Sequence, residues 1–255
     1  MSIITAKNVS LSVPDLVGPQ SSRVTNTKRF ILNSYFGSTS RHTKTILHDI
    51  NFTIEAGQRI AILGANGAGK TSLLRLLAGN LEPSSGKLRV DGHTHSLFNL
   101  QMGMHPKGTG RENIFLRGLQ LGMSMKDIRE KLDSVIEFAD IGENIDRSFS
   151  TYSAGMRLRL AIAITLMPTP EILIMDEWIG AGDKTFTTRL SNRLNEYVDN
   201  SRALAIASHN MNLVKRICTH AILLHKGKQI AFGAIDEVIE TKTNFDSKLR
   251  KDQHD

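Results

Sequence analysis

The sequence contains little of what secreted or membrane-spanning proteins need. Its single cysteine, Cys218, excludes an internal disulfide framework. No N-terminal stretch combines a basic start, an apolar run and a small-residue cleavage site, as a secretory leader would. The longest apolar runs, such as 172–175 and 221–224, have the length of a strand and are far too short to span a bilayer. We therefore expect an intracellular chain, and any membrane-spanning part of its machinery would belong to another protein.

The composition indicates a substantial folded core. At 255 residues with 40% hydrophobic residues, the chain has the size of one large α/β domain or of two closely joined subdomains. The formal net charge of +7 suits a polyanionic ligand, nucleic acid or an acidic membrane face. The charges are scattered along the chain, however, and many would serve solubility alone, so they do not choose among these ligands.

Two stretches with alternating and β-branched residues predict strands in the first quarter of the chain. They are "IITAKNVSLSV" at 3–13 and "TILHDINFTI" at 45–54, and we expect them to pair antiparallel at a sheet edge. Residues 14–45 between them are rich in Ser, Thr, Gly and basic residues, which indicates an inserted loop with a short helix at 28–36.

From residue 58 the pattern changes to that of a parallel α/β fold. A strand, a glycine-rich turn and a helix follow one another over 58–79, as in a βα unit. Residues 102–168 are predicted to be mostly helical. Apolar runs at 171–177 and 203–209 predict buried parallel strands, each followed by a polar helix. Within 124–141, the apolar residues expected on one helix face are Ile128, Leu132, Val135, Ile136 and Ala139.

The segment "GANGAGKTS" matches the P-loop pattern and lies between a predicted strand and a predicted helix. Its glycines let successive backbone N–H groups surround a phosphate, while Lys70 would neutralise the β and γ oxygens and Thr71 would ligate Mg²⁺. The alternative is a glycine-rich turn that only closes a βα unit, but the lysine and the context favour phosphate binding. The expected phosphate-binding residues are Gly64, Ala65, Asn66, Gly67, Ala68, Gly69, Lys70, Thr71 and Ser72.

Three polar residues follow apolar runs at the edge of the sheet where ligands of parallel sheets bind. Asp176 would hold the hydration shell of Mg²⁺, as a Walker B aspartate does, and Glu177 would polarise the attacking water as a general base. A solvated acidic turn is the alternative. His209 alone would be a satisfied core or surface histidine, but beside the Asp176 strand it would reach the γ-phosphate.

A second helix start has the features of an anion site. In "TYSAGMRLRLA", a small turn from Ser153 to Gly155 opens into an arginine-bearing helix, whose first backbone N–H groups would face an anion. The P-loop already provides one such site in the same chain. A simply capped helix is the alternative, and the turn alone, without other motifs, favours that alternative.

Five motifs in sequence order, the P-loop, "YSAGM", "LIMDE", "GAGD" and "SH", resemble the nucleotide-binding subunits of ABC transporters over residues 3–233. The resemblance implies ATP and Mg²⁺ as cofactors. It also implies an α/β fold: a P-loop NTPase core with a mainly parallel sheet, an antiparallel β edge and a helical subdomain. The expected divisions are one ABC ATPase domain at 1–240, with a RecA-like core at 1–100 and 169–235 and a helical subdomain at about 101–168, and a charged tail at 241–255.

In this family two subunits form a head-to-tail homodimer, and the signature turn of one subunit caps the γ-phosphate held by the P-loop of the other. The resemblance therefore assigns the second helix start to the partner's ATP. It makes Glu177 and His209 the catalytic residues, and Asp183 in "GAGD" a residue that couples the two sites. The residues expected to act in trans are Ser153, Ala154 and Gly155, and those expected at the metal are Thr71, Asp176 and Gln101.

Departures from the common family pattern point to a subfamily. Ala154 stands where Gly is usual, Met156 stands where Gln is usual, and "GAGD" replaces Ser-Ala-Leu-Asp. Together with "HPKGTGRENIFLRG" and "IEFADIG", these variants resemble exporters of bacterial surface polysaccharides, of the O-antigen, capsule and teichoic-acid types. This implies an ATPase on the cytoplasmic face of the cell membrane, peripheral through a separate permease. The permease would handle most of the lipid-linked glycan, and no nucleic acid is expected.

Two positions of the family pattern are not matched clearly: the glutamine that ligates the metal and the aromatic residue that stacks on adenine. Gln101 stands where a glutamine would ligate the metal and sense the permease, although "FNLQMGMHP" around it is atypical. An aromatic residue that stacks on adenine is expected near the end of the first strand, where this chain has Val13 and Pro14. Tyr35 or Phe36 would substitute for it, unless these rings pack in the core.

Two alternative functions share the catalytic motifs. A transporter subunit for another substrate would have the same residues, and only "YSAGM", "GAGD" and "GTGREN" favour the polysaccharide exporters over it. A soluble ABC ATPase that acts on ribosomes or DNA usually has two ATPase domains or long inserted arms. This chain has one P-loop and a short loop, which disfavours that class.

Overall fold

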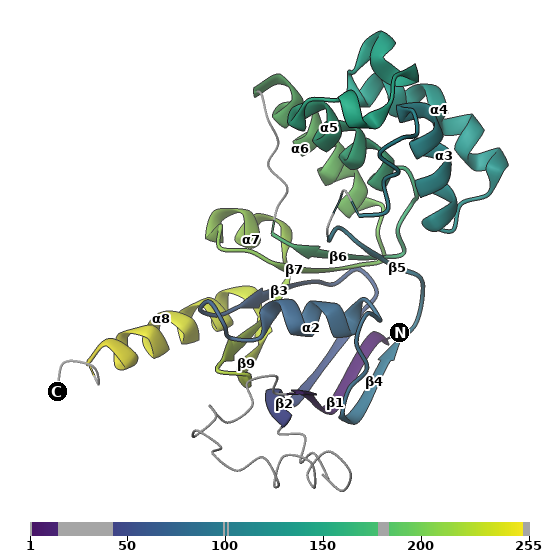
Figure 1. Ribbon diagram of the computed structural model, residues 1–255. Coiled ribbons are helices and arrows are strands. Elements are labelled where there is room, and N and C mark those ends of the chain that lie inside the picture. Colours follow the sequence, from purple (N-terminus) through teal and green to yellow (C-terminus); the bar gives the residue numbers. More distant parts are fainter. Residues whose placement is uncertain (1, 15–42, 99, 101, 178–183, 252–255) are drawn as a thin grey trace, which may run out of the picture.

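The computed structural model describes residues 2–14, 43–98, 100, 102–177 and 184–251. They form one sheet with helices on both faces and a separate group of helices beside it (Figure 1). The strands are β1 (Ser2–Pro14), β2 (Thr43–Glu55), β3 (Arg59–Leu63), β4 (Ser85–Val90), β5 (Thr94–Ser96), β6 (Ile172–Asp176), β7 (Ala203–Ala207), β8 (His220–His225) and β9 (Lys228–Ala234). The helices are α2 (Lys70–Leu77), α3 (Gly110–Gln120), α4 (Met125–Ala139), α5 (Ala154–Thr165), α6 (Lys184–Asp199), α7 (Met211–Ile217) and α8 (Ile235–Lys251), with 3-10 turns η1 (Gly142–Asp146) and η2 (Phe149–Thr151).

The sheet has the strand order β4-β1-β2-β9-β8-β3-β7-β6-β5. Strands β8, β3, β7, β6 and β5 run parallel to one another, whereas β8 pairs antiparallel with β9 and β1 pairs antiparallel with both β2 and β4. The predicted mainly parallel sheet with an antiparallel edge is therefore confirmed. Because β6 and β7 are direct neighbours, their carboxyl ends meet at one edge of the sheet.

Alternate residues of the central strands serve two different helix layers. In β3, Ile60 packs in a cluster with leucines of α2, while Ala61 packs with α6 and α7 on the opposite face. This period of two follows from the pleat of a strand, and it explains why the buried strands are apolar throughout. Burial of each large aliphatic side chain stabilises the fold by about 1.5–3 kcal/mol.

Helices α3, α4 and α5 form a helical subdomain that lies at the top of the view in Figure 1. On α4, Ile128, Val135 and Ala139 are buried and Leu132 and Ile136 are partly buried, as the predicted apolar face requires. Helix α5 also connects the subdomain to the core. Its Leu160 packs in the cluster of the helical subdomain, while Ile162 packs in the cluster of α6 and α7. Helix α5 is therefore packed against both parts.

Helix α8 follows β9 directly and packs against the end of β8, where the rings of His225 and Phe245 lie 5.0 Å apart. The expected domain boundary at residue 240 falls inside this helix. Within the described ranges, no helix is both long enough and apolar enough to cross a membrane. The predicted helix at 28–36 lies outside the described residues.

Candidate functional site

The P-loop connects β3 to α2 through a backbone that only glycine tolerates. Gly64, Gly67 and Gly69 have φ angles of 148°, 77° and 103°. A Cβ atom on Gly64 would lie 2.4 Å from the carbonyl oxygen of Leu224. Helix α2 has no side-chain cap and no acidic residue in its first turn. Its first N–H groups are therefore available to an external anion.

The P-loop borders a cavity of about 740 Å³, a size usual for small-molecule sites. The cavity lies at the edge where β6 and β7 end, and it thus brings together most residues predicted from the sequence. The residues that line it are Lys44, Thr45, Ile46, Asn66, Gly67, Ala68, Gly69, Lys70, Thr71, Ser72, Asp176, Glu177, Ala207, His209, Lys226 and Gly227.

The ammonium group of Lys70 is held by the P-loop backbone. It donates hydrogen bonds to the carbonyl oxygens of Gly64 at 2.8 Å and Ala65 at 3.1 Å. Partial burial lowers the pKa of Lys70, and the nearby carboxylates of Asp176 and Glu177 oppose that shift. A phosphate would supply further negative charge at this ammonium group and favour its protonated form.

Thr71 and Asp176 present two oxygen ligands side by side. The Thr71 hydroxyl donates to Asp176 Oδ2 at 2.7 Å, which joins the start of α2 to the end of β6. Hydroxyl and carboxylate oxygens suit Mg²⁺, which usually takes one or two protein ligands and completes its shell with phosphate and water. The described part of the chain has no cluster of three or more His, Cys, Asp or Glu side chains that would hold a metal alone. The donor set thus fits a metal that arrives with a nucleotide.

Glu177 is held in an unusual conformation at the end of β6. Its φ angle is +80°, a region that costs a non-glycine residue about 1–3 kcal/mol and that is frequent at functional sites. The backbone N–H donates to the Ala207 carbonyl at 2.8 Å. Glu177 Oε1 accepts hydrogen bonds from the Ser208 hydroxyl at 2.7 Å and from the His209 N–H at 3.4 Å. These bonds fix the carboxylate beside the cavity.

His209 follows β7, and β7 is the neighbour of β6, so the predicted proximity of His209 to the Asp176 strand is confirmed. The residue lines the cavity together with Glu177. Its contact with a phosphate remains a prediction.

The residues of the expected signature turn lie in the helical subdomain, away from the P-loop cavity of the same chain. Ser153 precedes α5 in the helical subdomain, and its hydroxyl oxygen accepts a hydrogen bond from the Met156 N–H at 3.2 Å. Ser153, Ala154 and Gly155 do not line the cavity of their own P-loop. The first turn of α5 contains no acidic residue, as in α2.

The sequence model of the ABC transporter family matches residues 47–180, a span that includes the P-loop, the signature turn and Glu177. This chain belongs to the ABC transporter family. The ATP-binding domain of that family accounts for the P-loop, the cavity and the two carboxylates together.

Relatives within the ABC transporter family are similar over most of this chain. The O-antigen export system ATP-binding protein RfbB of Klebsiella pneumoniae is 34% identical over 76% of this chain and 79% of that protein. The teichoic acids export ATP-binding protein TagH of Lactococcus lactis is 34% identical over 86% of this chain and 47% of that protein. TagH of Bacillus anthracis is 35% identical over 85% of this chain and 39% of that protein. The chain therefore spans about half or less of the length of these TagH proteins.

Solved structures show the same fold. An ATP-binding subunit of an ABC transporter superposes with a TM-score of 0.68 at 19% identity, over 94% of this chain and 93% of that one. The ATP-binding cassette MJ0796, in a dimeric post-hydrolysis state with ADP and phosphate, superposes with a TM-score of 0.64 at 18% identity, over 91% and 98%. The predicted ABC ATPase fold is confirmed.

Other residues of the family pattern lie outside the described residues. These are Gln101, Asp183, Tyr35 and Phe36, whose expected roles stay predictions. Val13, at the place of the expected adenine-stacking ring, is partly buried against the core.

The sequence interpretation missed a hairpin turn that supports the P-loop. Gly227, between β8 and β9, donates its N–H to the Ala68 carbonyl at 3.0 Å and accepts from the His48 N–H at 2.9 Å. A Cβ atom there would lie 2.1 Å from the Ile46 carbonyl oxygen. The Lys226–Gly227 pair between two apolar runs is a recognisable hairpin signal, but nothing local indicates its contact with the P-loop.

Proposed function

We propose that this chain is the ATP-hydrolysing cytoplasmic subunit of a bacterial ABC exporter of cell-surface polysaccharide, which powers a separate transmembrane permease. The observation that carries the proposal is the convergence of Lys70, the Thr71–Asp176 pair and Glu177 on one cavity. The substrate class, O-antigen, capsule or teichoic acid, follows from the variant motifs "YSAGM" and "GTGREN". The export systems named for RfbB and TagH support it.

ATP would place its phosphates over the P-loop and the start of α2. The ammonium of Lys70 then exchanges its carbonyl partners Gly64 and Ala65 for phosphate oxygens. Thr71 and Asp176 would hold Mg²⁺, with Gln101 as the further protein ligand that the family pattern suggests. When bound, the metal neutralises negative charge on the phosphate oxygens. The uncapped N–H groups at the start of α2 would bind the phosphate oxygens.

Glu177 acts as the general base of hydrolysis. Ser208 and the His209 N–H bind Oε1 of its carboxylate, which leaves Oε2 to accept the proton of the attacking water. The water oxygen bonds to the γ-phosphorus as the bond between that phosphorus and the ADP oxygen breaks. The imidazole of His209 contacts the γ-phosphate and helps to position the water.

Two copies bind head to tail, so that each cavity is completed by the signature turn of the other copy. Support comes from the position of Ser153, Ala154 and Gly155 outside their own cavity, at a helix start without acidic residues. Asp183 couples the two sites across the interface. Closure on ATP is passed through the helical subdomain to the permease, and this keeps the subunit at the cytoplasmic face of the cell membrane. The lipid-linked glycan is handled mainly by the permease, and no nucleic acid takes part.

The decisive experiment is affinity purification of tagged Glu177→Gln protein with ATP from detergent-solubilised host membranes, followed by mass spectrometry. Tagged Lys70→Ala is the control, because it loses the phosphate contact and would not trap the complex. We expect a small multi-span permease together with glycan-assembly enzymes. A permease for another solute would replace the substrate class. Ribosomal or DNA-repair proteins without a permease would contradict the transport function.

A further inference from the structure

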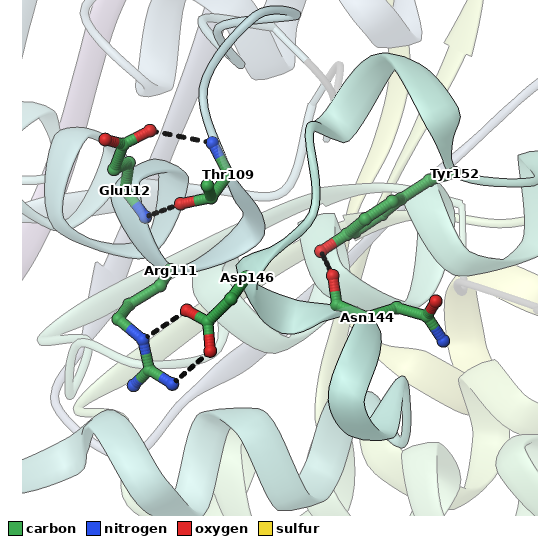
Figure 2. Close-up of polar contacts among 6 residues, drawn as sticks. All are labelled: Thr109, Arg111, Glu112, Asn144, Asp146 and Tyr152. Atoms are coloured by element: carbon green, nitrogen blue, oxygen red, sulfur yellow. Dashed lines mark hydrogen bonds and ion pairs between the residues drawn. The ribbon is translucent and has the colours of Figure 1, made fainter.

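Two segments of the helical subdomain lie side by side just before the signature turn (Figure 2). We call segments 105–113 and 144–152 together the clasp. Thr109 and Ser148 form an antiparallel bridge, and the Phe149 N–H donates to the Gly108 carbonyl at 2.8 Å. The clasp thus joins the first turn of α3 to the chain that leads into α5.

Polar contacts support the clasp both at the start of α3 and between its two segments. Thr109 and Glu112 form a capping box that fixes the start of α3. Between the two segments, Arg111 binds Asp146 through two parallel hydrogen bonds of 2.7 and 3.0 Å, as Figure 2 shows. This ion pair is exposed, so it contributes little, and the close contact of the clasp must come from elsewhere.

The close contact is made by Gly110 and Tyr152. Gly110 is buried, and a Cβ atom on it would lie 2.3 Å from the Tyr152 hydroxyl and 2.9 Å from the Ile145 carbonyl oxygen. The Tyr152 side chain is buried, and its hydroxyl donates to the Asn144 carbonyl at 2.6 Å (Figure 2). Burial raises the pKa of Tyr152, although a hydrogen bond from the Gly110 backbone opposes the shift, so the hydroxyl stays protonated near neutral pH.

Tyr152 is also the residue directly before Ser153, and its backbone is held in place. Its carbonyl accepts a hydrogen bond from Arg157 Nε at 3.1 Å, while Arg157 Nη2 donates to the Ser150 carbonyl at 2.7 Å. The Arg157 guanidinium lies 5.7 Å from the ring centre of Phe149. The position of the Tyr152 ring on Gly110 therefore determines where the backbone of Ser153 begins.

We propose that Tyr152, packed against Gly110, is a positioning residue that holds the signature turn where it can contact the ATP bound by a second copy. This inference rests on the proposed function, because it requires the ATP-dependent head-to-tail dimer. Tyr152 itself does not touch ATP. Its hydroxyl and ring keep Ser153, Ala154 and Gly155 aligned at the start of α5.

The test uses the full chain in the Glu177→Gln background and titrates ATP-dependent dimerisation by analytical ultracentrifugation. Tyr152→Phe removes the hydroxyl, and Gly110→Ala pushes a methyl group against it. Each variant should bind a fluorescent ATP analogue with the affinity of the parent, because the P-loop is unchanged. Each should need roughly tenfold more ATP to dimerise, the effect of one lost buried hydrogen bond or of a comparable displacement.

The double variant Gly110→Ala/Tyr152→Phe gives the sharpest readout. The added methyl group then occupies space that the missing hydroxyl leaves, so the double variant should dimerise at less ATP than Gly110→Ala alone. A merely additive loss would overturn the inference. So would Tyr152→Phe and Gly110→Ala variants that unfold at lower temperature but dimerise at the ATP concentration of the parent.

Ser124→Ala is the matched control for stability. It removes the capping box of α4 in the same subdomain, away from the signature turn, and should lower thermal stability without changing dimerisation. An equal shift in the ATP requirement of Ser124→Ala would overturn the specific role of Tyr152. If the Glu177→Gln parent binds ATP and stays monomeric, the proposed dimer fails, and this inference fails with it.

Discussion

Helices α2 and α5 both begin at turns that we propose to bind ATP phosphates, yet the two helix starts differ in structure. Helix α2 follows Gly69, whose φ angle is 103°, and no side chain caps it. Helix α5 follows Ser153, whose hydroxyl already accepts a hydrogen bond from Met156. The start of α2 is thus completed only by a ligand in its own cavity. The start of α5 is complete as a helix and offers its remaining donors to a second molecule.

The starts of α3 and α4 sharpen this contrast. Both have full capping boxes, in which Glu112 and Asp127 supply a negative charge to the first turn. An acidic residue there would repel an incoming phosphate. The first turns of α2 and α5 lack such a residue, as do those of α6 and α7, so its absence permits anion binding at α2 and α5 but does not by itself identify an anion site.

Mixed dimers test whether the start of α2 in one subunit and the start of α5 in the other bind the same ATP. When one subunit carries Lys70→Ala and the other carries Ser153→Arg, both lesions fall in one composite site and the second site stays intact. When one subunit carries both changes, each site has one lesion. We expect single-turnover ATP hydrolysis in the first arrangement and a loss of at least about 10²-fold in the second. Equal activities would contradict binding in trans.

Substitutions of Glu177 and Ser208 test whether the Glu177 carboxylate acts as the general base. Glu177→Gln should lower kcat by about 10²–10⁴-fold, because the general base is lost, while ATP affinity stays near that of the parent. Ser208→Ala keeps the carboxylate but removes the 2.7 Å hydrogen bond to Oε1, and should lower kcat by roughly tenfold. Steady-state ATPase assays with equilibrium nucleotide binding measure both effects. A Glu177→Gln protein with more than a tenth of the parent rate would refute the assignment.

A substitution in the hairpin turn between β8 and β9 tests whether the P-loop depends on its contact with Gly227. Gly227→Ala introduces a Cβ atom 2.1 Å from the Ile46 carbonyl at a φ angle of 79°. It should lower the free energy of unfolding by about 1–3 kcal/mol and weaken ATP binding. Gly57→Ala is the control, because Gly57 has a φ angle of 83° and open space around it. Denaturant unfolding and nucleotide titration should show a stability loss in both variants and weaker ATP binding only in Gly227→Ala.

The far end of α5 gives the smallest effect. The imidazole of His95 in β5 donates from Nε2 to the Thr165 carbonyl at 2.9 Å, and burial lowers the pKa of this histidine. Below the ordinary histidine pKa the unfolded chain takes up a proton that the folded chain does not. Stability should therefore fall as the pH drops below the ordinary histidine pKa. His95→Gln, which keeps a donor, should show a flatter pH profile in thermal unfolding, and an unchanged profile would exclude His95 as the cause.

The parts that could be predicted from the sequence depend on short segments with strong local constraints. The P-loop needs its glycines, and a buried apolar strand that ends in Asp176 must present it at the edge of a parallel sheet. The apolar face of α4 follows from helical periodicity, and Ile128 and Val135 are buried as expected.

What could not be predicted are contacts between segments far apart in the chain. The bond between Gly227 and Ala68 exists because β8 becomes the neighbour of β3, and no local pattern fixes that neighbour. The fit of Tyr152 on Gly110 similarly depends on how α3 and α5 pack. The expected roles of Gln101 and Asp183 stay predictions.

The backbone of Glu177 sets a limit on how this chain can be engineered. Selection for heat tolerance alone favours glycine at a position with a φ angle of +80°, because glycine adopts that angle without strain. Such a variant would survive heating well and lose the general base that we assign here. Thermostable versions of the chain should therefore be sought elsewhere, with residue 177 excluded from the library.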